Sequence, residues 1–382
     1  MKLEGGRTEG YLAFGCDVSG RGLDCRTLES ALAEIGPMGK TMRAAVFSEF
    51  GGPEVVEVRK MPVPEPGAGE VRLKVEAAAM NHLDLWVRRG LPIETPMPHI
   101  GGSDIAGTVD AVGPGAEAVP RGTRVAVDPA LGYEWYDGQP QGDAFDDARM
   151  RIVGEHTQGG FAEYAVVPAA SLLEIPEGFA STDAAAAGLV FVTAWRALIN
   201  RGGLRPGERV LITGASGGVG TAAVQIAVRA GARVYAVAGG PEKVRRVQEL
   251  GAHVVYDRHQ VDFSREVWRD TEKKGVHLVL DTVGEAVWSN CLRALAPCGR
   301  LVTSGATTGS RGVTEIRLVF WKQLSILGST MGSPAEYRQV MRLVFEKAVR
   351  PVVHEVIPLD ETRRAHELLE GGKVFGKLVI VP

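Results

Sequence analysis

A glycine-rich turn between two strongly patterned segments is the feature that most limits how this chain can fold. The apolar run "RVLITG" ends at Gly214, and the small-residue segment "GGVGTAAVQIAVRAG" follows it closely. From Ala215 the turn reads A-x-G-x-x-G. In such a turn Gly217 lets the backbone approach a pyrophosphate, Gly220 lets the helix pack closely on the strand, and the helix N-terminus offers free N–H groups. The turn therefore predicts a strand, a turn and a helix that bind a dinucleotide.

The pattern around this turn predicts an α/β fold with a parallel, doubly wound sheet. Strand-like runs at "RVLITG", "ARVYAVAG", "HLVLDTVG", "GRLVTSG" and "QLSILGS" are separated by helix-like segments, of which "PEKVRRVQELGA" is the second. This alternation is typical of parallel sheets with crossover helices. A P-loop is excluded, because the turn lacks the Gly-Lys-Ser/Thr ending. We expect the turn to contact the cofactor through Ser216, Gly217, Gly218 and Val219.

The end of the second strand favours NADP(H) over NAD(H) as the cofactor. An NAD site usually places Asp or Glu there, on the ribose hydroxyls. This chain instead has "AGGPEKVRR", with Gly239 at the cofactor and Lys243 as the leading phosphate partner. Arg245 and Arg246 follow, and the alternative is that these cations form the solvent-exposed face of a helix.

The rest of the chain predicts a second, β-rich domain. From Met42 to about Pro168, short β-rich runs are broken by Gly and Pro, which is typical of an antiparallel barrel or sandwich. Residues 131–154 are polar and acidic and longer than an ordinary loop. The last segment reads strand, helix, strand and is expected to return to this domain. We therefore predict a loosely ordered extension (1–41), a catalytic domain (42–188 and 327–382) and a cofactor domain (189–326).

Composition excludes several classes of function. A chain of 382 residues has room for two domains. A net charge of −3 gives no basic field for nucleic acid or anionic membranes, and no apolar run approaches the roughly 18 residues of a spanning helix. The four cysteines form no CxxC pair. We expect a cytoplasmic enzyme with a small-molecule substrate and without nucleic-acid or membrane partners.

The motifs together resemble the medium-chain dehydrogenase/reductase superfamily, over about residues 42–382. They include "GEVRLKVEAAAMNHLDLWVRRG", "GGSDIAGTVDAVGPG", "GGFAEYAVVP", "LRPGERVLITGASGGVGTAAVQIA" and "FGKLVIV". The resemblance implies a GroES-like barrel with an inserted Rossmann domain, assembled as a homodimer or homotetramer, with "QLSILGS" as a candidate pairing edge. It also implies which residues surround the cofactor: Asn81 and Thr193 at the nicotinamide, Lys243 and Tyr256 at the adenosine phosphate, and Gly305 and Lys377 along the remainder.

The positions of the zinc ligands in zinc-dependent relatives are altered here. The cysteine ligand is replaced by Asn81, the histidine ligand by Ser103 and the following glutamate by Asp104, and "AAAAGLVFVTAW" offers no third thiolate. Residues 131–154 contain no cysteine for a structural zinc lobe. Other competent donors remain in a spacing that matches no ligand pattern, namely His82, Asp84, His99, Glu155 and His156. We predict no metal, a loop or surface position for His82 and His99, and a bracing role for Asp84 beneath the cofactor.

Without zinc, the resemblance favours the quinone oxidoreductase and enoyl reductase branch, in which NADPH reduces an activated C=C or a quinone. Leu83 replaces the proton-relaying hydroxyl of alcohol dehydrogenases, and Trp86 replaces the tyrosine that has been proposed as a proton donor. We take Asn81 and His156 as catalytic candidates, with Tyr133, Tyr136 or solvent as other proton sources. The alternatives are an alcohol dehydrogenase with an atypical or absent zinc site and a non-catalytic NADPH-binding protein.

Overall fold

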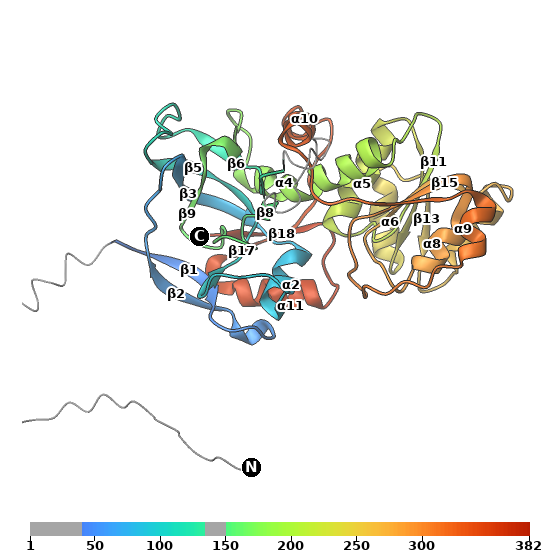
Figure 1. Ribbon diagram of the computed structural model, residues 1–382, viewed down its shortest axis with the longest axis horizontal. Coiled ribbons are helices and arrows are strands. Elements are labelled where there is room, and N and C mark those ends of the chain that lie inside the picture. Colours follow the sequence, from blue (N-terminus) through green and yellow to red (C-terminus); the bar gives the residue numbers. More distant parts are fainter. Residues whose placement is uncertain (1–39, 134–149) are drawn as a thin grey trace, which may run out of the picture. The chain divides into compact units, whose positions relative to one another are not determined.

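Two sheets of different kinds make up the fold, as a computed structural model shows (Figure 1). The structure describes residues 40–133 and 150–382. The predictions for residues 1–39 and for Tyr136 therefore lie outside the described residues. Residues 41–382 form one unit, and the parallel and barrel portions below both belong to it.

The parallel sheet has six strands in the order β13-β12-β11-β14-β15-β16. The strand order reverses between β11 and β14, so the carboxyl ends of these two central strands open a crevice where α/β sheets bind ligands. This confirms the predicted doubly wound sheet. Its strands are β11 (Arg209–Ile212), β12 (Arg233–Ala238), β13 (Val254–Asp257), β14 (Val276–Asp281), β15 (Leu295–Thr303) and β16 (Ser325–Gly328).

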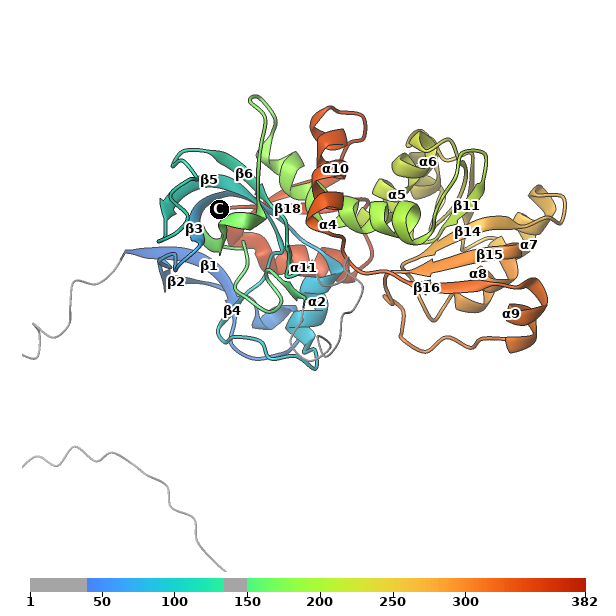
Figure 2. The same ribbon diagram turned by 45° about the horizontal axis from the view of Figure 1, so that its top comes forward.

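Helices cover both faces of this sheet because alternate strand residues point to opposite sides (Figure 2). In β11, Val210 and Ile212 join a hydrophobic cluster with α5, whereas Leu211 joins a second cluster with α7 and α8. Five helices belong to this portion: α5 (Gly218–Arg229), α6 (Pro241–Glu249), α7 (Phe263–Asp270), α8 (Trp288–Ala294) and α9 (Ile316–Lys322).

The other portion is a β-barrel assembled from both ends of the chain. Its largest sheet follows the order β10-β6-β5-β3-β18-β17, with β9 also on β3, and a smaller sheet follows β2-β1-β4. As predicted, the C-terminal segment returns here, since β18 pairs with β3. The strands are β1 (Thr41–Phe47), β2 (Glu57–Pro62), β3 (Glu70–Ala79), β4 (His99–Ile100), β5 (Asp104–Val112), β6 (Arg124–Val127), β9 (Tyr164–Pro168), β10 (Leu172–Glu174), β17 (Val353–Pro358) and β18 (Lys377–Val381).

Helices α2 (His82–Arg89) and α11 (Thr362–Glu370) pack at one side of the barrel. The predicted long loop (131–154) is not wholly irregular. Near its two ends, β7 (Ala130–Leu131) pairs with β8 (Arg151–Ile152). Short 3-10 turns occur at Pro53–Val55, Ala169–Ser171 and Leu359–Glu361.

A buried helix connects the two portions. Helix α4 (Ser181–Trp195) continues into a π-helical turn (Arg196–Arg201) and packs against β5, α5 and α10 (Pro334–Phe345). Contrary to the expectation that no apolar run is long enough, Ser181–Arg201 is the one stretch among the described residues that could cross a membrane by length and composition. However, 67% of its most apolar window is buried inside the fold. This burial explains its apolar composition, since a core helix is hydrophobic on every side.

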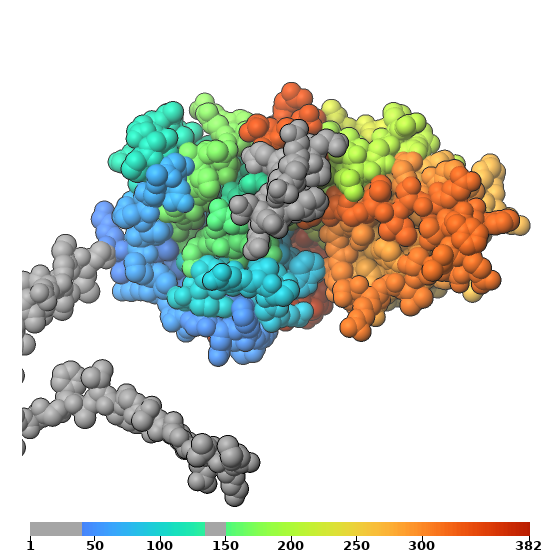
Figure 3. All heavy atoms as spheres, in the orientation of Figure 1, coloured from blue at the N-terminus to red at the C-terminus, as the bar shows by residue number. Residues whose placement is uncertain are grey.

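Strand β16 forms one of the two edges of the parallel sheet, within the orange surface seen in Figure 3. Large apolar side chains are exposed on and beside α9, namely Val313, Ile316, Phe320 and Trp321. Exposed apolar patches next to a free strand edge are typical of association surfaces. Self-association of this chain through the segment "QLSILGS" stays a prediction.

Candidate active site

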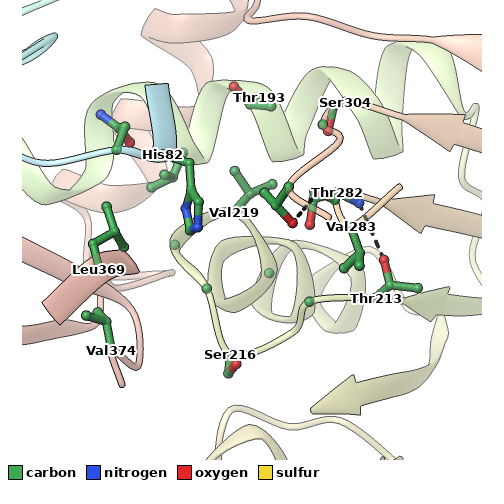
Figure 4. Close-up of a pocket in the computed structure, with 18 of the residues that line it drawn as sticks. His82, Thr193, Thr213, Ser216, Val219, Thr282, Val283, Ser304, Leu369 and Val374 are labelled. Atoms are coloured by element: carbon green, nitrogen blue, oxygen red, sulfur yellow. Dashed lines mark hydrogen bonds between the residues drawn. The ribbon is translucent and has the colours of Figure 1, made fainter. Parts of the chain in front are cut away.

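A cavity of about 420 Å³ lies where the barrel meets the carboxyl ends of the parallel strands. Figure 4 shows His82 from α2, Thr193 from α4, and Ser216 and Val219 from the glycine turn around the same space. Most of the residues predicted from the sequence line it: Asn81, Thr193, Ser216, Gly217, Gly218, Val219, Gly239, Lys243, Gly305 and Lys377. The fold thus gathers residues that lie far apart in the chain, from Asn81 to Lys377.

The glycine turn is shaped by close backbone contacts. A Cβ at Gly220 would lie 2.2 Å from the Gly214 carbonyl oxygen, so this position can hold no side chain without movement. A Cβ at Gly217 would meet only that oxygen, at 3.5 Å, and therefore faces open space. The N–H of Gly376 donates to the Ser216 carbonyl (2.9 Å), which holds the C-terminal segment against the turn.

The cavity fits a nicotinamide dinucleotide. Helix α5 begins at Gly218, and the N–H groups of its first turn have no hydrogen-bond partners within the helix. These free N–H groups are suited to bind a diphosphate. Two hydroxyl oxygens on the cavity wall, Thr193 Oγ1 and Ser304 Oγ, are buried and have no hydrogen-bond partner among the described residues. Buried hydroxyls are normally paired, so both are available to polar groups of a bound cofactor.

The end of the cavity near β12 is cationic. Lys243 and Arg258 line it, and no Asp or Glu does so among the described residues. The Lys243 ammonium donates to the Gly372 carbonyl (2.6 Å), and burial together with Arg258 lowers its pKa. Arg258 was missed by the sequence reasoning, although it lies directly after β13, where a parallel strand delivers residues to the cofactor edge.

The two arginines beyond Lys243 do not line the cavity. Arg245 pairs with Glu249 one helical turn away, on an exposed face. The Arg246 guanidinium lies 3.9 Å from the centre of the Phe375 ring. The solvent-face alternative therefore describes Arg245, whereas the half-buried Arg246 packs on the C-terminal segment.

The predicted position of Tyr256 is corrected by the structure. Its ring packs in the hydrophobic cluster on the α7 face of the sheet, 6.5 Å from the Tyr235 ring, and its hydroxyl donates to Asp270 (2.9 Å). Strand alternation turns Tyr256 away from the cavity, and the chain reaches the cavity wall two residues later.

His156 is also placed differently from the prediction of a catalytic acid. Its Nδ1 accepts a hydrogen bond from the Ile152 N–H (3.2 Å), and burial with Arg151 lowers its pKa. Ile152 lines the cavity and His156 does not. The ring therefore stabilises the turn after β8. Tyr133 is buried and donates to the Thr330 carbonyl (2.9 Å), which gives it a packing role.

Two of the altered positions, Asn81 and Asp104, are tied together by a lysine, whereas the buried Ser103 hydroxyl has no partner among the described residues. The Lys377 ammonium donates to Asn81 Oδ1 (2.5 Å) and to Asp104 Oδ2 (3.1 Å), and Asn81 Nδ2 also donates to Asp104 (2.9 Å). Gly188 has no side chain to offer as a ligand and packs closely on this group, since a Cβ there would lie 2.4 Å from Asp104 Oδ1. The described residues contain no group of three His, Cys, Asp or Glu that could hold a metal ion. An ammonium among these groups does not fit a zinc site, and the lack of zinc stays a prediction.

Asp84 braces the loop beneath the cavity, as expected. Its carboxylate accepts the N–H of Asn81 (2.7 Å) and of Gly102 (2.8 Å). Burial raises the pKa of Asp84 to about 6. Of the two histidines predicted at the surface or in a loop, His82 lines the cavity. His99 is fully buried beside the Gly154 carbonyl (3.0 Å), which corrects that prediction.

Glu155 is expected to lower the free energy of unfolding at neutral pH. Burial, with Asp84 close by, raises the pKa of Glu155 from 4.5 to about 7. The folded state then holds the proton more tightly than the unfolded state, so the free energy of unfolding falls as pH rises from about 4.5 to about 7. At roughly 1.4 kcal/mol per pH unit this amounts to at most about 3 kcal/mol.

The Glu155→Gln variant tests this, because glutamine carries no charge at any pH. We expect it to be more stable than wild type at pH 8 and equally stable near pH 4.5, by urea unfolding. Exposed Glu174→Gln serves as the control and should leave the pH profile unchanged. Equal slopes for Glu155→Gln and wild type between pH 5 and 8 would rule out this role of Glu155.

Comparison with known proteins agrees with this geometry. Residues 67–177 match the alcohol dehydrogenase GroES-like domain, and residues 218–346 match the zinc-binding dehydrogenase family. Human quinone oxidoreductase is 32% identical over 353 residues, which span 90% of this chain and 98% of that protein.

Solved structures of related enzymes agree in fold. An NAD-dependent alcohol dehydrogenase has a TM-score of 0.83 at 43% identity, covering 89% of this chain and all of that one. The crotonyl-CoA carboxylase/reductase AntE, solved in complex with NADP, has a TM-score of 0.80 at 26% identity. The match covers 90% of this chain and 96% of that one. With its barrel, its parallel sheet and its dinucleotide cavity, the chain belongs to the medium-chain dehydrogenase/reductase superfamily of nicotinamide-dependent oxidoreductases.

Proposed function

We propose that the protein is an NADPH-dependent reductase of an activated C=C, in an enone or enoyl thioester, or of a quinone, and that it acts without zinc. The observation that carries this proposal is the pairing of two features in one cavity. The dinucleotide-binding turn is intact, while Asn81, in place of a cysteine ligand, is hydrogen-bonded to Lys377 and Asp104. Quinone oxidoreductases and crotonyl-CoA reductase among the relatives support this reaction class.

The preference for NADPH rests on the cationic end of the cavity. A ribose 2′-phosphate carries negative charge, which Lys243 and Arg258 would stabilise and which an Asp or Glu would repel. When bound, NADPH supplies a hydride from its nicotinamide. The α5 N-terminus would hold the diphosphate of NADPH, and Thr193 and Ser304 would bind other polar groups of the cofactor. A small acceptor would lie against Leu83 and Trp86.

A panel of acceptors tests the reaction class and the cofactor together. Quinones, enones and enoyl thioesters would each be offered with NADPH and with NADH, and cofactor oxidation followed by absorbance. We expect turnover of at least one acceptor class, with kcat/KM higher for NADPH. Tight NADPH binding with no turnover of any acceptor would instead support the non-catalytic alternative.

Removing the two cations should change cofactor preference. In Lys243→Ala/Arg258→Ala, loss of two charge-assisted contacts, each worth about 1.5–3 kcal/mol, should weaken NADPH binding by about 100-fold or more. NADH has no 2′-phosphate, so its binding should change little. Fluorescence titration with both cofactors measures this, and Arg245→Ala, on the exposed face of the same helix, is the matched control. Parallel losses for both cofactors would contradict phosphate recognition at this site.

Alcohol oxidation is the second candidate, because the NAD-dependent alcohol dehydrogenase neighbour is 43% identical. It requires a group that stabilises an alkoxide, commonly zinc. Elemental analysis of protein purified without added metal would decide the metal-dependent version, since that version requires stoichiometric zinc. Oxidation of primary and secondary alcohols with NAD⁺ and NADP⁺ would decide the metal-free version.

A further inference from the structure

We propose that the Lys377 ammonium is a catalytic group: it hydrogen-bonds the carbonyl oxygen of the acceptor and gives that oxygen a proton as negative charge builds on it. This inference rests on the proposed function, because it assigns a role within the reduction of a conjugated carbonyl compound. In this role the Lys377 ammonium would stabilise the negative charge on the oxygen, as a metal does in zinc-dependent relatives.

The position of Lys377 is fixed by buried partners. The residue begins β18, and only 4% of it is exposed. Its Nζ donates to Asn81 Oδ1 (2.5 Å) and Asp104 Oδ2 (3.1 Å). Asp104 is itself held, because its other carboxylate oxygen accepts the N–H of Leu189 (2.6 Å). A group held this firmly needs little reorganisation during reaction, which is the condition for strong electrostatic stabilisation.

One N–H bond of this ammonium remains for a ligand. An ammonium has three N–H donors, and within the described part of the chain only Asn81 and Asp104 accept from it. Lys377 lines the cavity together with Asn81, Leu83 and Thr193, whereas Asp104 does not line it. The cation therefore faces the cavity while its counter-charge lies behind it. That arrangement presents a positive group to an acceptor that gains electrons.

The proposed step balances. A hydride reaches the β-carbon of the enone and a C–H bond forms there. The electron pair of the C=C bond forms a new double bond between the α-carbon and the carbonyl carbon, and the π pair of the C=O bond moves to the oxygen. A Lys377 N–H bond breaks as the O–H bond of the enol forms. The enol then takes a proton from water at its α-carbon and loses the O–H proton to water, and water returns a proton to Lys377. The acceptor is reduced by two electrons and NADPH is oxidised to NADP⁺.

A purely structural role for Lys377 makes a different prediction. Its aliphatic stem lies against the glycine turn, since a Cβ at Gly218 would lie 2.8 Å from Lys377 Cδ. If the side chain only supports that turn, methionine would keep most of this packing. Loss of the lysine would then weaken NADPH binding but leave kcat at saturating cofactor unchanged.

The experiment compares Lys377→Met, Lys377→Arg and Lys377→Ala with wild type, using whichever enone is turned over by wild type. We expect kcat to fall by about 100- to 1,000-fold in the Met and Ala variants, as for loss of one donor to a developing oxyanion. The NADPH dissociation constant should stay within about threefold, which is under 0.7 kcal/mol. Arginine, which remains cationic, should lose less. Lys373→Met, an exposed lysine in the same segment, is the control with unchanged kcat.

Chemical rescue supplies a readout that a structural role would not move. Methylammonium chloride added to Lys377→Ala should raise kcat with saturation, because the vacated space can admit a small cation, whereas sodium chloride at equal ionic strength should not. If Lys377→Met retains kcat within about threefold of wild type, or only NADPH affinity falls, or sodium chloride rescues equally, the assignment is overturned while the reductase proposal stands. A wild-type protein inactive on every acceptor overturns the reductase proposal, and the Lys377 role with it.

Discussion

A Gly220→Ala variant is expected to lose at least about 100-fold in NADPH affinity and several kcal/mol of folding stability. The added methyl group would lie 2.2 Å from the Gly214 carbonyl oxygen and 2.6 Å from Ala215 Cα, both parts of the backbone. Neither neighbour can rotate away, so α5 must move off β11. That movement carries the helix N-terminus, with its N–H groups, away from the diphosphate position.

Gly217→Ala separates binding from folding at the same turn. Its methyl group would meet only the Gly214 oxygen, at 3.5 Å, which is ordinary contact. The free protein should therefore keep its stability, while the methyl group occupies space that the diphosphate needs. Thermal unfolding and NADPH titration of both variants measure these effects. Native NADPH affinity in Gly220→Ala, or equal destabilisation by both substitutions, would contradict the close-packing argument.

The second large effect is expected from Asp104→Asn, which should lower the free energy of unfolding by about 3–5 kcal/mol. Asparagine keeps the shape of aspartate but removes its charge. The Lys377 ammonium, 3.1 Å from Asp104 Oδ2, would then stay buried without a counter-charge. The pair has little contact with water, so solvent cannot replace the lost interaction.

A double substitution distinguishes this cause from general damage to the core. In Asp104→Asn/Lys377→Met the unpaired ammonium is gone, so stability should recover by about 2 kcal/mol or more relative to Asp104→Asn. The exposed pair of Arg364 and Glu355 provides the control, since Glu355→Gln should cost less than about 1 kcal/mol. Denaturant unfolding of wild type, Asp104→Asn, Lys377→Met and the double variant measures the coupling, with Glu355→Gln as a fifth protein. Additive effects of the two core substitutions would contradict an ion-pair origin.

The glycine turn illustrates what local pattern can predict. Gly220 is required by the close contact of one strand, one turn and one helix, and Gly217 leaves space for a diphosphate a few residues away. Lys243 follows from the same unit, because the second strand ends at a fixed edge of the sheet. These interactions are local in sequence, so spacing alone places the residues at the cavity.

Tyr256 and His156 show where pattern fails. Whether a side chain at the end of a strand faces the cavity or the core depends on strand twist and on which helix covers that face, and Tyr256 faces the core. His156 sits in a turn whose direction is set by the pairing of β7 with β8 and by its own bond to Ile152. Arg258 was missed for the same reason, since nothing in its immediate sequence marks the direction of its side chain.

The sequence by itself determined the fold class, the dinucleotide turn, the cationic end of the cavity and the replacement of the usual zinc ligands, because each depends on residue types at short spacing. Only the tertiary structure decided that Lys377 lies among the replaced positions, 273 residues along the chain from Asp104. That contact exists because β18 returns to pair with β3, and β3 also pairs with β5, which begins at Asp104. Strand pairing between distant segments leaves no local pattern in a sequence, so it required the folded chain.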